Sequence, residues 1–319
     1  MKMAMKFKRK RFDDFVPKKT VYHVGVGDRI ISVVTYLVYA IFAFVCVYPF
    51  YYIFINTISN NDMSAKGKVI FLPHEIHFNN YAQVLKIEGI GRALWVSVER
   101  TVIGTVLTLL VAAFLGFMFT RESLWHRKLW SRLVVATMYF NAGIIPTYIT
   151  MMNLGLLNNF WVYIFPVAVQ PFYIILCKTY VESVPKELMD AAEIDGAGTL
   201  LLFFKIVIPV IKPILATIAV FAAVAQWNSF QDTLLYITDK KLYPLQYLLY
   251  TYMNSASSLK ALVSSTASAA SLAASLAHAQ TAVSIRMTVT MVVVAPILLV
   301  YQFFQRYFTK GIMIGAVKG

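Results

Sequence analysis

Charged residues and cysteines are scarce in this chain of 319 residues. Charged side chains make up 14% of the sequence and hydrophobic ones 59%. Soluble domains typically contain about 25% charged residues, so the composition places the chain among integral membrane proteins. The two cysteines, Cys46 and Cys177, both fall in apolar runs. Their positions argue against a disulfide framework and favour thiols buried in a membrane.

Motifs for nucleotide binding, metal binding and catalysis are also missing. No GxxxxGK[ST] segment occurs, so this chain is not expected to bind ATP. The segment from His74 to His77, HEIH, has its histidines closer together than the zinc motif HExxH, and Pro73 precedes it. We therefore expect no metal site. The sequence also shows no nucleophile paired with a base, as an enzyme would need.

The net charge of +14 does not indicate nucleic-acid binding. Such proteins gather basic residues on one face of a domain, often with aromatic side chains for base stacking. Here the basic residues lie between long apolar runs, beginning with a tail over residues 1–29. The expected partner is the lipid bilayer, and no nucleic acid is expected.

Six apolar runs are long enough for transmembrane helices, which need about 20 residues each. They cover residues 30–55, 93–119, 133–152, 160–180, 214–237 and 287–308. The first run is too long for a signal-peptide core and lacks a small-residue cleavage site, so we expect it to be retained. The predicted fold class is an all-α polytopic membrane protein with six transmembrane helices.

This pattern predicts five parts of the chain. They are a basic N-terminal tail (1–29), a first helix (30–55), an external loop (56–92), a core transmembrane domain of five helices (93–308) and a C-terminal tail (309–319). The face with both termini would carry more than twice as many lysines and arginines as the opposite face. Because positive residues favour the cytoplasm, both termini are expected to be cytoplasmic in a multi-pass protein of the cell membrane.

Two further segments have alternative interpretations. Glu99 and Arg100 fall inside the second run, and charges within a span are candidates for function. We favour the alternative that they neutralise each other near the interface, with their charged ends in water. An Ala/Ser-rich tract over residues 254–283 forms either a weakly helical external cap or a flexible segment.

A charged stretch over residues 182–213 separates the fourth and fifth runs. Charge at this density does not lie in hydrocarbon, so the stretch should lie in water at a membrane face. Pro185 suits the start of a helix, and Gly196 can form the left-handed turn that ends it. Thr199 can cap a second helix, and Pro209 breaks the chain before the next run. The prediction is a helix, a bend and a second helix.

The order of residues in this stretch resembles the EAA motif of ABC importer permeases. The matching residues are Asp190-Ala191-Ala192, then Gly196, then Ile206-x-Ile208-Pro209. Asp190 replaces the family's glutamate, and Ile208-Pro209 replaces its Leu-Pro pair. In that family the loop is a coupling helix that docks in a groove of the ATPase. The coupling residues that the resemblance implies are Glu187, Asp190, Ala191, Ala192, Asp195, Gly196, Ala197 and Pro209.

Two other segments support the resemblance. Trp227-Asn228-x-Phe230 is similar to the WNxF of sugar-importer permeases, and the end of the chain, residues 310–319, is similar to KGxxxGAxKG. The likeness is to the carbohydrate-uptake, maltose-type, LplC-like group. It implies the type I ABC importer transmembrane fold and alternating access. It also implies three partners: a second homologous permease subunit, an ABC ATPase dimer that binds ATP and Mg, and an extracytoplasmic solute-binding protein. No cofactor is implied for this chain.

Uncharged polar and aromatic side chains within the runs are candidates for a substrate pathway. They are Asn141, Gln170, Gln226, Trp227, Asn228 and Gln231. Amide groups and aromatic rings suit a neutral sugar. The same groups also hydrogen-bond between transmembrane helices, and for any single residue we favour packing over sugar contact.

Other transport functions stay open. The EAA-like loop alone fits an importer of another solute, such as an amino acid, a polyamine or a phosphate ester. The WNxF run, the chain end and the absence of charged pairs in the middle of the spans favour a sugar. A stand-alone secondary carrier often shows mid-membrane carboxylates and internal repeats. We see no repeat, and only Glu99 and Asp232 approach the membrane, both toward the outer side.

Overall fold

The computed structural model describes residues 25–254 and 282–316, in which no strand occurs. Most of the basic tail, most of the Ala/Ser-rich tract and the last three residues lie outside these ranges, so the interpretations placed on them stay predictions. The chain divides into two units, residues 1–51 and 52–319. Each unit is described by itself.

The first unit contains most of α1 (Val26–Thr57). The Asp28 carboxylate lies in the first turn and accepts a hydrogen bond from the Gly25 N–H at 3.1 Å. This carboxylate favours the helix start, because the first N–H groups of a helix have no internal partners. Apolar side chains such as Tyr36 and Phe42 are exposed. By length and composition, α1 is suited to cross a membrane.

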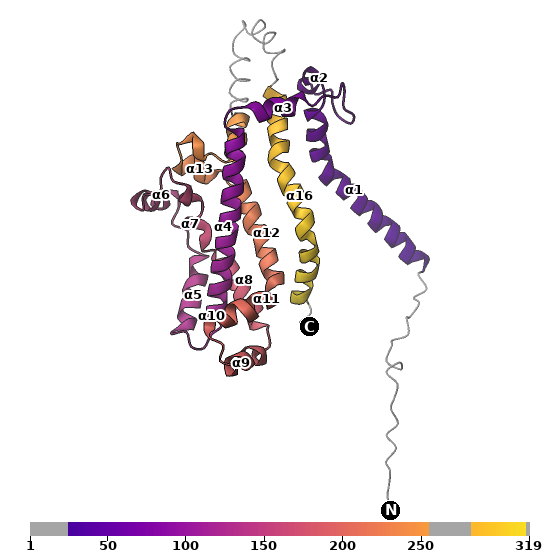
Figure 1. Cartoon of the computed structure of the whole chain (residues 1–319). Coiled ribbons are helices and arrows are strands. Elements are labelled where there is room, and N and C mark those ends of the chain that lie inside the picture. The colour runs from indigo at the N-terminus through magenta and orange to yellow at the C-terminus, as the bar shows by residue number, and fades with distance from the viewer. Residues whose placement is uncertain (1–24, 255–281, 317–319) are drawn as a thin grey trace, which may run out of the picture. The chain divides into compact units, whose positions relative to one another are not determined.

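The second unit is organised around α4 (Ile90–Met118), which contacts both α8 (Pro171–Glu182) and α12 (Lys212–Asn228). In turn, α12 contacts α16 (Ala282–Ala316), and Figure 1 shows α4, α12 and α16 running side by side. The buried residues of α4 are mostly small, which lets neighbouring backbones approach closely. They include Gly104, Thr108, Ala112, Ala113 and Gly116.

The fourth predicted run is bent, and a second bend lies just before the fifth run. The fourth run begins with η2 (Phe160–Tyr163) and α7 (Phe165–Ala168), and the chain then turns by 45° into α8. Proline cannot donate a backbone hydrogen bond, and Pro171 opens α8 at this bend. Among the described residues, α1 and α4 are long and apolar enough to span a membrane, and the number rises to four if each bent pair counts as one span. The count of six therefore stays a prediction.

The third and fifth runs are each divided into two helices. Residues 133–152 fall in α5 (Arg127–Thr137) and α6 (Ile144–Asn153), so this run is not one helix. The break contains Gly143, whose φ of +85° interrupts helical geometry. In the fifth run, α12 ends at Asn228 and α13 (Gln231–Tyr236) follows, before the short η4 (Lys240–Leu242).

The segment after α1 is a folded lobe that contains α2 (Asn61–Ala65) and α3 (Asn79–Lys86). The Asn80 amide donates to the Thr57 carbonyl oxygen at 2.9 Å, which holds α3 against the end of α1. The HEIH segment lies in this lobe. Its Glu75 carboxylate accepts from the Asn60 amide at 2.6 Å, so this carboxylate has a structural contact.

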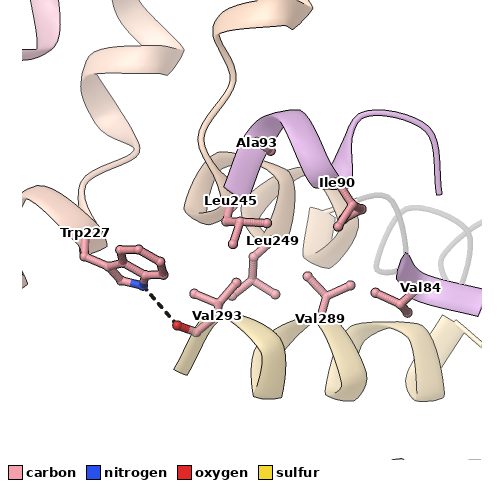
Figure 2. Close-up of a cluster of buried hydrophobic side chains, with 8 residues drawn as sticks. All are labelled: Val84, Ile90, Ala93, Trp227, Leu245, Leu249, Val289 and Val293. Atoms are coloured by element: carbon pink, nitrogen blue, oxygen red, sulfur yellow. Dashed lines mark hydrogen bonds between the residues drawn. The ribbon is translucent and has the colours of Figure 1, made fainter. Parts of the chain in front are cut away.

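A buried apolar cluster joins α3, α4, α12 and α16, as Figure 2 shows. Its members are Val84, Ile90, Ala93, Trp227, Leu245, Leu249, Val289 and Val293. The Trp227 indole N–H donates to the Val293 carbonyl oxygen at 3.0 Å. A buried indole N–H needs such a partner, so this contact fixes α12 against α16.

Candidate functional site

The EAA-like stretch forms the predicted helix, bend and second helix. The first helix is α9 (Lys186–Ile194), with Pro185 just before it. The left-handed turn predicted at Gly196 is confirmed, with φ +82°. The Gly196 N–H donates to the Glu193 carbonyl at 2.9 Å, and the Ala197 N–H donates to the Ala192 carbonyl at 2.9 Å. These two bonds form a Schellman motif, which satisfies the last carbonyls of a helix.

The predicted cap at Thr199 is wrong. Thr199 is already the first residue of α10 (Thr199–Leu202), and Gly198 occupies the N-cap position without a side-chain hydrogen bond. A capping residue needs a non-helical backbone, which Gly198 has at φ −69° and ψ 163°. The helix then continues through η3 (Phe203–Val207) and α11 (Ile208–Val210), and bends by 81° into α12. Pro209 lies in α11, before this bend.

One face of the stretch is exposed, and its tip combines the small residue Gly196 with the large apolar side chain of Ile194. Ile194 is 86% exposed, and a Cβ atom added at Gly196 would meet nothing within 4 Å. Among the other motif residues, Ala192 and Ala197 are half-buried. The remaining motif residues are exposed, namely Glu187, Asp190, Ala191, Asp195 and Pro209. A partner protein can therefore approach this tip closely.

The opposite face is fixed to the transmembrane helices. Leu202, Phe203 and Val207 are buried against Phe117 of α4 and Val181 of α8. The Phe203 ring centroid lies 5.7 Å from that of Phe117. The stretch is thus packed on α4 and α8, and Met189 and Ala192 of α9 pack against the same cluster.

Two ion pairs and a polar cleft lie beside α9. Arg121, just after α4, pairs with Glu193 of α9. Lys178 of α8 pairs with Glu182 at 2.8 Å. The cleft has a volume of about 900 Å³, and Lys186 is among its charged lining residues. Such a surface suits water or a polar partner better than lipid.

At the other end of α4, Arg100 forms a buried polar centre that sequence reasoning missed. Its side chain is 1% exposed and forms an ion pair with Asp232 of α13. The guanidinium carbon lies 4.3 Å from the centroid of the Tyr163 ring. Gln226 of α12 links the centre together, because its amide nitrogen donates to the Tyr163 carbonyl at 3.2 Å. Four elements, α4, η2, α12 and α13, therefore meet here.

Every N–H donor of Arg100 is occupied within the protein. An arginine has five such donors. The Gln226 amide oxygen accepts from Nε at 3.3 Å and from Nη2 at 3.1 Å. The Ser229 carbonyl accepts from Nη1 at 3.2 Å, and the Asp232 carboxylate accepts from both Nη1 and Nη2. A buried charge is tolerated when it is paired and hydrogen-bonded in this way.

This geometry corrects one sequence interpretation. Arg100 does not neutralise Glu99 with its charged end in water; it turns inward to Asp232, while Glu99 is only half-buried. Arg100 and Asp232 form a charged pair that the sequence did not reveal. The reason is that Arg100 and Asp232 are far apart in sequence, and only helix packing brings them together.

A cavity of about 280 Å³ opens next to this centre. Two of the six candidate pathway residues, Gln170 and Gln226, line it, together with Tyr173, Ser229 and Asp232. The Gln226 amide already bonds Arg100 and Tyr163, whereas no hydrogen bond is described for the side chain of Gln170.

The other four candidates lie elsewhere. Trp227 belongs to the apolar cluster of Figure 2, on the side of α12 that faces α16. Asn141 lies in the break between α5 and α6, where its side-chain oxygen accepts from the Gly143 N–H at 2.9 Å. Asn228 and Gln231 are exposed. The structure therefore does not bring these four residues to the cavity.

Comparison with known proteins identifies the family. The family described as "Binding-protein-dependent transport system inner membrane component" matches residues 19–314. The chain belongs to this family. It is thus an inner-membrane permease component of a transport system that depends on a binding protein.

Related proteins and one solved structure agree with this assignment. The polygalacturonan/rhamnogalacturonan transport system permease protein YtcP of Bacillus subtilis (strain 168) is 34% identical over 92% of this chain and 99% of its own length. The lactose transport system permease protein LacG of Rhizobium radiobacter is 30% identical over 91% of this chain and 97% of its own length. A chain of a bacterial ABC transporter involved in importing the acidic polysaccharide alginate superposes with a TM-score of 0.77, at 29% identity, over 89% of this chain and 98% of that chain.

Proposed function

We propose that this chain is the permease subunit of an ATP-driven importer that moves a sugar or oligosaccharide across the cytoplasmic membrane. The family supplies the transport role and the membrane location. The relatives support the substrate class, because they are named for saccharide transport. Their substrates include both acidic polymers and neutral lactose, so the names do not decide between a charged and an uncharged saccharide.

The observation that carries the proposal is the two-sided structure of the EAA-like stretch. Its tip at Gly196 is exposed and open, while Phe203 and Val207 are buried against α4. A separate ATPase that docks on the tip would therefore move α4 and its neighbours as it closes. Two packed arrangements of the same helices are sufficient for alternating access.

We further assign the remaining parts of the assembly. ATP and Mg bind to an ATPase dimer, not to this chain. A second homologous permease completes the pathway, and an extracytoplasmic binding protein delivers the solute. Both termini and the EAA-like stretch face the cytoplasm, an orientation that rests on the distribution of lysine and arginine.

A substitution at Gly196 tests the coupling. Gly196→Asp places a side chain in the docking surface and strains the left-handed turn. We expect saccharide uptake by the assembled importer to be lost, while the amount of chain in the membrane stays unchanged. The measurement is uptake of labelled saccharide in cells, together with the ATPase recovered when this chain is purified.

Gly155→Asp is the matched control. Gly155 also has a positive φ, +65°, and open space around its Cβ position, but it lies after α6 and away from α9. Backbone strain alone would affect both variants, whereas loss of docking affects only Gly196→Asp. Normal uptake by Gly196→Asp would refute the coupling role.

A further inference from the structure

The cavity beside Arg100 has an unusual distribution of charge. Its charged lining groups are the Arg100 guanidinium and the Asp232 carboxylate. The guanidinium side chain is 1% exposed and the carboxylate side chain 20% exposed. Both members of the pair line the cavity, and the carboxylate is the more accessible of the two.

The guanidinium has no donor left for a ligand, because its five N–H groups already bond Gln226, Ser229 and Asp232. The carboxylate differs. Its Oδ1 accepts from Arg100 and from the Thr233 N–H at 2.8 Å, and its Oδ2 accepts from Arg100. Two carboxylate oxygens offer about four acceptor positions, so at least one remains for a hydroxyl group.

The other lining groups suit hydroxyl groups as well. Gln170 has a half-buried side-chain amide that offers both donors and an acceptor. Tyr173 lies in the same wall and has an aromatic ring that can pack on the apolar face of a sugar. The lining contains no further cation that could bind an acid group.

We propose that Asp232, Gln170 and Tyr173 form a saccharide subsite that binds uncharged sugar rings and disfavours uronate rings. A uronate would place its carboxylate near that of Asp232, in a site where like charges repel more strongly than in water. A neutral sugar instead donates hydroxyl hydrogens to Asp232, whose charge is held in place by Arg100. This inference rests on the proposed function. Among the kinds of saccharide for which the relatives are named, it favours the neutral ones over the acidic ones.

The test uses two matched probes, an α-1,4-linked galactotriose and trigalacturonate, which differ only at C6. The complete importer is purified without its binding protein, reconstituted in nanodiscs without ATP, and titrated with each probe. The measured quantity is thermal stabilisation, because a bound ligand stabilises the folded complex by RT ln(1 + [L]/Kd). Wild-type protein should bind galactotriose at least about tenfold more tightly, since placing two like charges side by side typically costs more than the 1.4 kcal/mol that corresponds to tenfold.

Asp232→Asn should weaken galactotriose binding by about tenfold, because a hydrogen bond to a charged group is replaced by a neutral one. The same variant should improve trigalacturonate binding. Asp239→Asn is the control, since Asp239 is an exposed aspartate whose side chain accepts only from the nearby Lys241 N–H in the described contacts. It should bind both probes as the wild type does.

A second variant tests the subsite even if Asp232→Asn fails to assemble. Gln170→Ala removes no hydrogen bond described in the chain, so the stability measured before sugar is added should stay unchanged. It should weaken galactotriose binding by about fivefold, which is the effect of one neutral hydrogen bond. Equal binding of the two probes by wild type, or no stabilisation by either, would overturn the subsite. ATP-dependent saccharide uptake by the same complex would then still support the proposed function.

Discussion

The crossing of α4 and α8 at Gly116 allows a quantitative prediction. A Cβ atom added at this glycine would lie 2.6 Å from the Cys177 Cβ, 2.9 Å from the Lys178 backbone nitrogen and 3.0 Å from the Ile174 carbonyl oxygen. Two of these three atoms belong to the backbone of α8, so no side-chain rotation can relieve the contact. The two helices must move apart for Gly116→Ala to be accommodated.

The expected loss of stability follows from this geometry. Inserting a methyl group into a well-packed interior typically costs about 1–3 kcal/mol. The upper part of this range applies here, because α8 packs on α4 over several turns and also contacts α12. We expect Gly116→Ala to lower the temperature at which the detergent-purified chain aggregates by several degrees, measured by gel filtration of the supernatant after heating.

Gly91→Ala is the matched control for this substitution. Gly91 lies in the same helix, and a Cβ added there meets nothing within 4 Å. It should leave the aggregation temperature unchanged or raise it slightly, because alanine favours a helix by about 0.8–1 kcal/mol over glycine. A second check is Cys177→Ala, which should not rescue Gly116→Ala, since the Cβ atom of residue 177 remains. Equal stability of the two glycine variants would refute the close approach of α4 and α8.

Two further predictions concern α12. In Gly104→Ala the new methyl group would lie 2.8 Å from the Gln226 Cδ, so the amide must leave Arg100, with a loss of about 1.5–3 kcal/mol for hydrogen bonds to a charged group. The measurement is the thermal stability of the purified chain. Adding Gln226→Ala to Gly104→Ala should lower that stability little further, because both changes break the same contacts. Trp227→Phe should reduce stability by about 1 kcal/mol, because an aromatic ring stays but the hydrogen bond to the α16 carbonyl is lost. The control is Trp161→Phe, since Trp161 is 43% exposed. A loss of stability in Trp227→Phe no greater than that in the control would argue against this contact.

Several features could be predicted from the sequence because their causes are local. The turn after α9 forms where Gly196 stands, since glycine adopts positive φ without steric penalty. Residues 182–213 lie outside the apolar runs because of their charge density alone. Long apolar runs likewise predict α1 and α4, as each one is sufficient to span a bilayer.

Other features depend on contacts between distant residues. Asn141, Trp227 and Gln170 were equivalent candidates in the sequence, yet only Gln170 lines the cavity, because the direction of each side chain depends on which helices pack together. The division of the third run into α5 and α6 was also unpredicted, since apolar composition does not reveal where a helix breaks.

The sequence by itself indicated a polytopic membrane protein whose charged stretch, residues 182–213, resembles the EAA motif of ABC importer permeases, because composition, charge and motif spacing act over a few turns of chain. Only the tertiary structure decided that Arg100 is buried and paired with Asp232. These residues are separated by more than a hundred positions, and a guanidinium can leave water only where a carboxylate and carbonyl groups replace its hydration. That replacement exists only once α4, α12 and α13 are packed together.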